Sequence, residues 1–133
     1  TYFYNVYGLR EIQKGKYATL IALFKEKMKN GEALTIVSPG SQRRNFTHIN
    51  DIINGLVLVG ENGFGDEFGI GSPEDYTIKQ IAKMFGGKIE MRPERKGNRM
   101  EADMITAKTK SLGWKANKNI EDYIEEIRKN NWK

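Results

Sequence analysis

Two arginine-rich segments contain the residue types best suited to chemistry in this sequence. Arg43 and Arg44 lie within residues 42–46, directly before an apolar helical pattern, and residues 92–99 carry four basic residues in eight. A planar guanidinium group donates paired hydrogen bonds to phosphate oxygens, so two such segments that converge could hold a diphosphate. The same charges could also be ordinary exposed loop residues, and composition alone does not separate these two interpretations.

Other reactive side chains have simpler structural explanations. His48 is the single histidine and precedes a helical pattern, so it could be a base or a capping residue, although a lone histidine is more often structural. Asn50 or Asp51 is the expected N-cap of that helix. The glycines within residues 63–69 superficially resemble a dinucleotide loop, but such a loop follows a strand and opens a helix, whereas here a strand is expected after the glycines.

Composition excludes several classes of protein. The 133 residues include no cysteine, which excludes disulfides, thiol catalysis and cysteine–zinc sites. They include one histidine, which excludes a multi-histidine metal cluster. We therefore predict no metal site. The most apolar stretch, residues 52–59, is interrupted by Asn54 and Gly55, so no membrane association is expected.

The charge balance permits an alternative from a different class. With 22 Lys and Arg against 17 Asp and Glu, the net charge is +5, which a small basic nucleic-acid-binding module would share. Such a module needs aromatic side chains among its basic loops, but most of the 14 aromatics (2 Trp, 6 Tyr and 6 Phe) occupy expected core positions.

Helical and strand patterns alternate along the chain, which predicts an α/β fold. Helices are expected at residues 17–29, 49–59, 76–85, 104–112 and 119–132. Short strands are expected at residues 2–7, 33–37, 67–70 and 88–91. Ser72 and Pro73, followed by two acidic residues, predict the start of the third helix. No linker or repeat interrupts the pattern, so residues 1–133 are expected to form a single substrate-binding domain. The absence of an initiator methionine suggests a fragment of a longer protein.

Several motifs, in this order, resemble a known family. They are Tyr-Asn-Val-Tyr-Gly at 4–8, Gly-Ser-Gln-Arg-Arg-Asn-Phe-Thr-His-Ile-Asn-Asp at 40–51, Arg-Lys-Gly-Asn at 95–98 and Leu-Gly-Trp at 112–114. Together they resemble the C-terminal half of the extended short-chain dehydrogenase/reductases, the NAD-dependent nucleotide-sugar epimerases and dehydratases. The resemblance covers nearly the whole chain. It implies an α/β fold with a small mixed sheet and helices, and with the Rossmann NAD-binding half absent from this chain.

The resemblance implies four substrate-binding residues. Asn5 matches an asparagine that contacts the nucleotide-sugar near its phosphates, and Arg44 matches an arginine that binds the diphosphate. Arg95 matches a second phosphate- or ribose-contacting arginine, and Asn98 stands where the family has a ribose-contacting aspartate. Three positions depart from the family pattern: Tyr2 in place of arginine, and Asn45 and Asn98 in place of aspartate.

The resemblance also implies that the NAD-binding loop and the catalytic pair lie outside this chain. The family's glycine-rich NAD loop and its Tyr-x-x-x-Lys pair precede the Asn-Val-Tyr-Gly motif, and none of the six tyrosines here is followed by lysine four residues later. No catalytic residue is therefore expected in this chain, and its cofactor-binding residues are unknown. NAD(P) would be bound mainly by the N-terminal Rossmann half of the full-length enzyme, and none by this chain alone.

The function expected from these observations is the nucleotide-sugar-binding part of an NAD-dependent sugar-nucleotide epimerase, with the 4-epimerase type favoured. A nucleotide-sugar 4,6-dehydratase of the same family is the alternative. The expected partners are a nucleotide-diphosphate sugar, the N-terminal half of the same enzyme and further copies of the chain in a homo-oligomer, in the cytoplasm. The sequence does not decide which sugar nucleotide is bound, or whether the cofactor is NAD or NADP.

Overall fold

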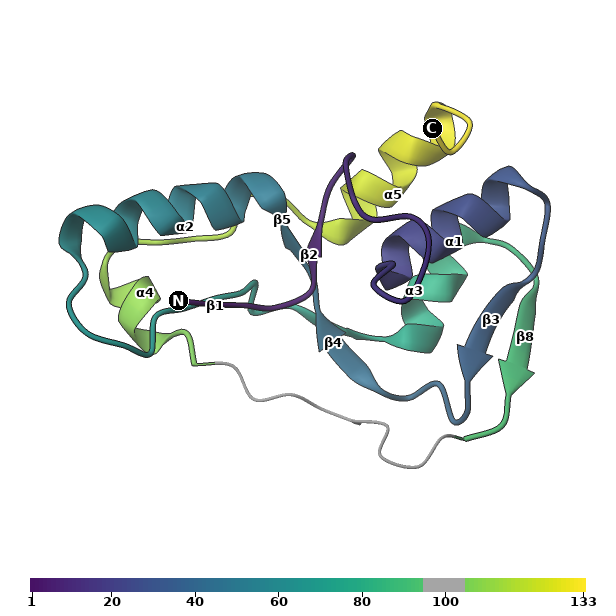
Figure 1. The fold of residues 1–133 in the computed structure, drawn as a ribbon. Helices are drawn as coiled ribbons and strands as arrows, with labels where there is room; N and C mark the ends of the chain where they lie inside the picture. Colours follow the sequence, from purple (N-terminus) through teal and green to yellow (C-terminus); the bar gives the residue numbers. More distant parts are fainter. Residues whose placement is uncertain (95–104) are drawn as a thin grey trace. The chain divides into compact units, whose positions relative to one another are not determined.

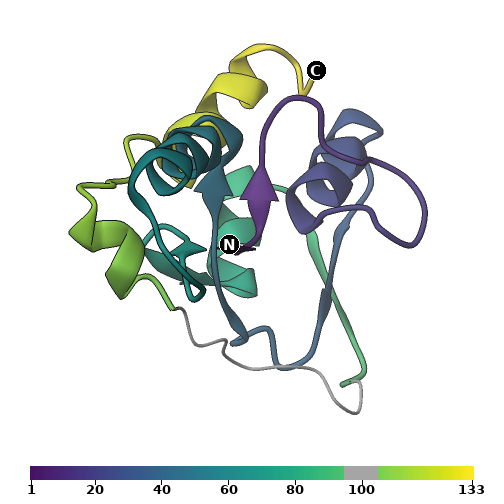
Figure 2. The same ribbon diagram turned by 60° about the vertical axis from the view of Figure 1, so that its left-hand side comes forward.

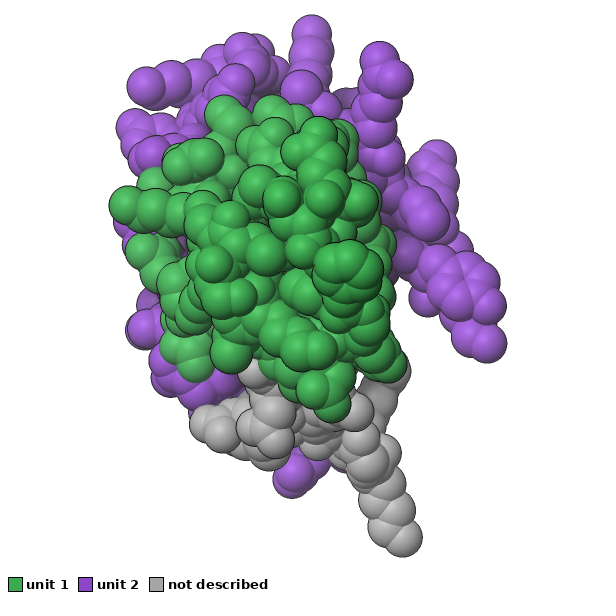
Figure 3. All heavy atoms as spheres, turned by 90° about the vertical axis from the view of Figure 1, so that its left-hand side faces the viewer, with its two compact units in different colours: residues 1–8, 45–75, 103–120 green, residues 9–44, 76–102, 121–133 purple. Residues whose placement is uncertain are grey.

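The computed structural model of the protein describes residues 1–94 and 105–133. The chain divides into two compact units (Figure 3). Unit 1 contains residues 1–8, 45–75 and 103–120, and unit 2 contains residues 9–44, 76–102 and 121–133. Each unit is therefore assembled from three segments that are distant in the sequence. Arg95 and Asn98, two of the predicted substrate-binding residues, lie outside the described residues.

Unit 1 combines short parallel strand pairs with one long helix. Its elements are β1 (Tyr2–Phe3), β2 (Val6–Tyr7), β5 (Thr47–His48), α2 (Ile49–Asn62), β6 (Gly69–Ile70) and α4 (Ala107–Ser111). β1 pairs in parallel with β6, and β2 pairs in parallel with β5. The chain after α4 runs beside α2 (Figure 1).

The core of unit 1 forms where α2 meets β6 and the segment after α4. Ile52, Ile70 and Trp114 are buried against one another there. Gly55 makes this close approach possible, because a Cβ at that position would lie 2.9 Å from Ile70 side-chain atoms and 3.0 Å from the indole nitrogen of Trp114.

Unit 2 is built around one longer strand pair. Its elements are α1 (Leu20–Lys29), β3 (Leu34–Val37), α3 (Ile78–Phe85), β8 (Ile89–Arg92) and α5 (Ile120–Lys129), whose first residue is assigned to unit 1. β3 and β8 are parallel, with Leu34 opposite Ile89 and Val37 opposite Arg92, and they lie side by side in Figures 1 and 2. β4 (Arg43–Asn45) pairs with β7 (Asp75–Thr77), and the chain passes between the units within these two strands.

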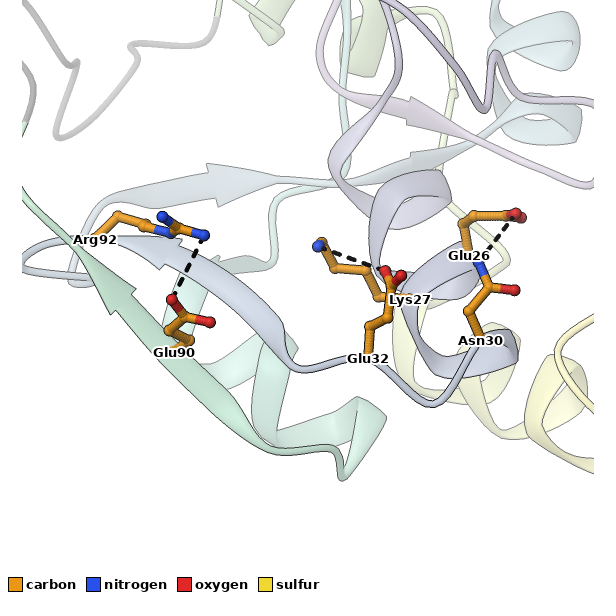
Figure 4. Close-up of polar contacts among 6 residues, drawn as sticks. All are labelled: Glu26, Lys27, Asn30, Glu32, Glu90 and Arg92. Carbon is orange, nitrogen blue, oxygen red and sulfur yellow. Dashed lines mark hydrogen bonds and ion pairs between the residues drawn. The ribbon is translucent and has the colours of Figure 1, made fainter.

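Aromatic contacts form part of the core of unit 2, beside a larger number of buried aliphatic side chains. The rings of Phe24 and Phe85 meet edge to face with centroids 5.5 Å apart, and Trp132 stacks on Phe85 at 5.4 Å. The polar surface of α1 carries an exposed hydrogen bond between Glu26 and Asn30 and, at 3.9 Å, a pair between Lys27 and Glu32 (Figure 4). Exposed pairs of this kind contribute little to stability, so the buried aromatic and aliphatic contacts hold the unit together.

The predicted α/β class is confirmed, with five helices and small parallel strand pairs among the described residues. The predicted single buried strand at residues 2–7 is wrong. Asn5, with a φ of +43°, interrupts the extended backbone between β1 and β2, and Tyr2 and Phe3 are 45% and 49% exposed. β1 has one strand neighbour among the described residues, which leaves its aromatic side chains open.

The predicted N-cap of one helix and the predicted start of another are wrong, although α2 begins at Ile49 as expected. The N-cap of α2 is His48, whose Nδ1 accepts a hydrogen bond from the N–H of Asn50 at 3.1 Å. α3 begins after Thr77 rather than Ser72, because Thr77 and Gln80 form a reciprocal capping box. Residues 75–77 instead form β7, so the chain stays extended beyond the proline.

Candidate functional site

A pocket lies at the carboxyl ends of the parallel strands β3 and β8. Its volume is about 540 Å³, and its lining residues are Thr35, Val37, Arg92, Pro93 and Glu94. In α/β proteins, ligands bind preferentially at the carboxyl ends of parallel strands. The predicted basic segment begins at this place, so the structure supports a ligand site in unit 2.

Arg92 is the described basic residue of this pocket. Its Nη2 lies 3.4 Å from Oε1 of Glu90, and both side chains are more than half exposed (58% and 54%; Figure 4). An ion pair with this exposure is weak, because water and salt screen it. The guanidinium group can therefore exchange Glu90 for an anionic ligand at low cost.

Gln42 contributes a polar group that sequence reasoning missed. The side chain is 3% exposed, and its Nε2 donates a hydrogen bond to the carbonyl of Val37 at 3.1 Å, at the end of β3 that lines the pocket. Its Oε1 is buried and accepts no hydrogen bond within the described part of the chain. A buried acceptor without a donor is costly. Gln42 does not line the pocket itself and is connected to it only through the Val37 carbonyl.

Arg44 lies in β4 with a half-buried side chain. Its Nη1 donates a hydrogen bond to the carbonyl of Arg43 at 2.7 Å. This contact uses one nitrogen of the guanidinium fork, which has five N–H donors in all. The diphosphate contact expected of Arg44 stays a prediction.

Asn5 lies between β1 and β2 in unit 1, with an exposed side chain and a backbone in the left-handed region. Asparagine tolerates this conformation better than most residues. Its carbonyl accepts a hydrogen bond from the N–H of Thr47 at 3.2 Å, which holds the turn. Asn5 and Arg44 belong to different units and Arg95 and Asn98 are not described, so the convergence of all four stays a prediction.

The contacts of Asn45 explain why asparagine fits where the family pattern has aspartate. Its side-chain amide donates to the carbonyls of Ser72 at 2.9 Å and Glu74 at 3.3 Å. An aspartate here could not donate these hydrogen bonds and would place a negative charge against two carbonyl oxygens. The asparagine therefore fits the extended path of the chain before β7.

His48 and Asp51 have structural roles in unit 1. The His48 ring caps α2 and packs edge to face on Tyr7, with centroids 5.2 Å apart. Asp51 is 1% exposed, and its Oδ2 accepts the N–H groups of Asn117 at 3.1 Å and Lys118 at 3.0 Å. Every described contact of Asp51 is thus internal to the unit.

The glycines of residues 63–69 do not form a dinucleotide loop. The glycines of residues 63–69 follow the end of α2 at Asn62 and precede β6, which begins at Gly69. A phosphate-binding glycine loop needs the reverse order, with a helix N-terminus after the glycines. These residues therefore do not fit NAD.

Within residues 1–94 and 105–133, no group of three or more histidine, aspartate or glutamate side chains is placed to hold a metal ion. No helix in the same residues is long and apolar enough to cross a bilayer.

Comparison with known proteins identifies the family. A sequence model of the NAD dependent epimerase/dehydratase family matches residues 2–71, which is more than half of the chain. The chain belongs to this family. The family resemblance inferred from the motifs is thereby confirmed, and its relatives include nucleotide-sugar epimerases, 4,6-dehydratases and decarboxylases.

Two comparisons show sequence similarity beyond the fold. UDP-glucuronic acid decarboxylase 1 of Danio rerio is 30% identical over 120 residues, covering 84% of this chain and 28% of that protein. A UDP-glucose 4-epimerase of Thermotoga maritima, solved with UDP-glucose, is 28% identical with a TM-score of 0.80, covering 96% of this chain and 45% of that one.

A third comparison supports the fold alone. An epimerase of Methanothermobacter thermautotrophicus has a TM-score of 0.85 at 24% identity, covering 98% of this chain and 42% of that one. The chain thus spans about a quarter of the length of the curated relative and less than half of the solved structures.

Proposed function

We propose that this chain is the nucleotide-sugar-binding part of an NAD-dependent sugar-nucleotide epimerase of the 4-epimerase type. One observation supports this most directly: the pocket at the carboxyl ends of the parallel strands β3 and β8 is lined by Arg92, whose exposed guanidinium group can bind an anion. A nucleotide offers such an anion. The 28% identity to an epimerase solved with UDP-glucose is consistent with this ligand class.

Each residue has a specific task in this proposal. Arg44, with Arg95, holds the diphosphate through paired charge-assisted hydrogen bonds. Asn5 and Asn98 contact the phosphate and ribose regions. The chain binds and orients the substrate, whereas the cofactor, when bound elsewhere in the full-length enzyme, supplies hydride transfer.

A second candidate is a nucleotide-sugar decarboxylase. The decarboxylase of Danio rerio is 30% identical over most of this chain, which is the observation that favours it. A 4,6-dehydratase of the same family is the third possibility. All three share the binding of a nucleotide-diphosphate sugar, so the binding test below does not depend on the reaction.

A titration of the 15N-labelled chain with UDP, UDP-glucose and UDP-glucuronic acid tests the proposal. We expect saturable shifts for the amides around Val37, Gln42 and Arg92, and the same spectra report whether the chain is folded. Uridine without phosphate should bind more weakly. A folded chain that shows no saturable shift with any of the three nucleotides would overturn the proposal.

Arg44→Ala and Arg43→Ala separate specific contacts from general charge. Hydrogen bonds to charged groups contribute roughly 1.5–3 kcal/mol, so Arg44→Ala should weaken UDP binding about ten- to hundredfold. Arg43→Ala removes the same charge and should have a much smaller effect. Equal effects of the two substitutions would mean that the segment attracts the ligand by net charge alone.

A further inference from the structure

Unit 1 contains a second pocket that the proposed function does not use. Its volume is about 510 Å³, within the usual range for small-molecule sites. It is lined by residues 72–74, which follow β6, by Lys110 of α4, and by residues 114–119. All of these residues belong to unit 1, so the pocket is complete within one compact unit.

Internal hydrogen bonds fix one wall of this pocket. The indole N–H of Trp114 donates to the carbonyl of Asp51 at 2.9 Å, and the Asp51 carboxylate accepts the N–H groups of Asn117 and Lys118. Since Asp51 is buried in the first turn of α2, this wall is attached to the rigid part of the unit. A ligand would find residues 114–118 already ordered, which lowers the entropic cost of binding.

The opposite wall is fixed in the same way. Asn45 donates to the carbonyls of Ser72 and Glu74, and the N–H of Ser72 donates to Oγ1 of Thr47 at 2.8 Å. These contacts occupy the carbonyls of Ser72 and Glu74 and the N–H of Ser72, and they hold residues 72–74 in place.

The charge of the lining is strongly positive. Lys110, Lys115 and Lys118 line the pocket with exposed side chains, against a single acidic lining residue, Glu74. Within residues 1–94 and 105–133, none of these three lysines forms an ion pair. Three ammonium groups around one pocket create a positive potential that favours a multiply charged anion.

We propose that this pocket binds a small phosphorylated molecule at a site separate from the nucleotide-sugar site. The lysines would surround the phosphate group, and the amide of Asn117 and the hydroxyl of Ser72 would contact a polar body. Inorganic phosphate shares the anionic part of this chemistry, and a sugar phosphate shares both parts. A neutral sugar lacks the charge that the lysines recognise.

Titrations of the 15N-labelled chain with ribose 5-phosphate, inorganic phosphate and ribose test this proposal. Saturable shifts confined to residues 72–74 and 110–119 are expected with ribose 5-phosphate. Phosphate should produce weaker shifts at the same amides, and ribose should produce none. Equal binding of phosphate and ribose 5-phosphate would identify a phosphate site without a polar subsite and overturn the proposed ligand class.

A charge-matched pair of variants decides whether the pocket lysines act as a site. The first combines Lys110→Gln, Lys115→Gln and Lys118→Gln, and the control combines Lys29→Gln, Lys83→Gln and Lys133→Gln in unit 2. Both lower the net charge by three. Ribose 5-phosphate should bind the pocket variant at least about tenfold more weakly and the control within about twofold of the parent chain.

Three further outcomes would overturn the proposal. They are the absence of saturable binding to the folded parent chain, equal losses in the two variants, and shifts centred on residues 37–44 instead of the pocket. Dispersed spectra of both variants confirm that each one is folded. Because UDP binding at β3 and β8 is followed through different amides, failure here leaves the proposed function intact.

Discussion

Asp51 and Trp114 meet in the core of unit 1, where the indole N–H of Trp114 donates to the Asp51 carbonyl at 2.9 Å. The residues are 63 positions apart, and both are buried, at 1% and 5% exposure. The Asp51 side chain extends the same connection to the N–H groups of Asn117 and Lys118. One aspartate in the first turn of α2 therefore fixes the segment that follows α4.

Replacing Asp51 tests this connection. Asp51→Ala leaves two backbone N–H groups without an acceptor and should lower the free energy of unfolding by about 2–4 kcal/mol. Urea denaturation measures the change. Glu61→Gln removes one charge from the exposed far end of the same helix and should change stability by less than about 0.5 kcal/mol. A loss below about 1 kcal/mol in Asp51→Ala would contradict the structural role.

Two glycines of α2 should respond oppositely to the same substitution. A Cβ at Gly55 would lie 2.9 Å from Ile70 and 3.0 Å from Trp114, whereas a Cβ at Gly60 meets nothing within 4 Å. Gly60→Ala should raise the free energy of unfolding by about 0.5–1 kcal/mol, through the better helix propensity of alanine. Gly55→Ala should lower it by about 1–3 kcal/mol through overpacking.

Thermal and urea unfolding of the two glycine variants check this pair. Both substitutions lie in one helix and gain the same helix propensity, so the difference between the two variants reports the packing around Gly55. If Gly55→Ala were as stabilising as Gly60→Ala, the packing of α2 on Ile70 and Trp114 would be wrong.

Local patterns predicted most of the elements but not their assembly. Gly86 ends α3 in the left-handed conformation at the position expected from its sequence. The N-caps were mispredicted because His48 and Thr77 compete with Asn50, Asp51 and Ser72, and capping strength alone does not decide among neighbours. The winning residue depends on where tertiary contacts place the first turn.

The candidate site was predictable only in part, for a similar reason. The basic character of the segments around Arg44 and Arg92 is visible in the sequence. The buried contact between Gln42 and Val37 is not, since it depends on the carbonyl of Val37 reaching the Gln42 amide in the folded chain. The division into two units is equally hidden, because each unit combines three separated segments.

Asn45→Asp tests the explanation for the departure at this position. The substitution keeps the shape of the side chain, but it replaces a donor to the carbonyls of Ser72 and Glu74 with a charged acceptor. We expect a loss of about 1–3 kcal/mol at neutral pH. The loss should shrink below about pH 4, because a protonated carboxyl can donate one hydrogen bond.

Asn54→Asp is the control for this prediction, since Asn54 is exposed on α2. Its effect should stay within about 0.5 kcal/mol. Chemical denaturation at neutral and acidic pH measures both variants. An Asn45→Asp chain as stable as the parent at neutral pH would show that the amide contacts contribute nothing.

The raised pKa of Tyr123 predicts that the free energy of unfolding falls at alkaline pH. Burial raises its pKa above the usual value, and the nearby carboxylates of Glu11 and Glu126 raise it further. Below about pH 10 the phenol is neutral in both the folded and the unfolded chain, so this group adds no pH dependence. Above about pH 10 the unfolded chain releases the proton while the folded chain retains it. Ionisation then favours the unfolded chain, by up to about 1.4 kcal/mol per pH unit for this single group.

Urea denaturation between neutral pH and a pH of about 11 measures this effect. The free energy of unfolding should decline less steeply with rising pH in Tyr123→Phe than in the parent chain. Tyr17→Phe, at a ring that is 75% exposed, should keep the parent's decline. Identical alkaline slopes for the parent and Tyr123→Phe would contradict the raised pKa.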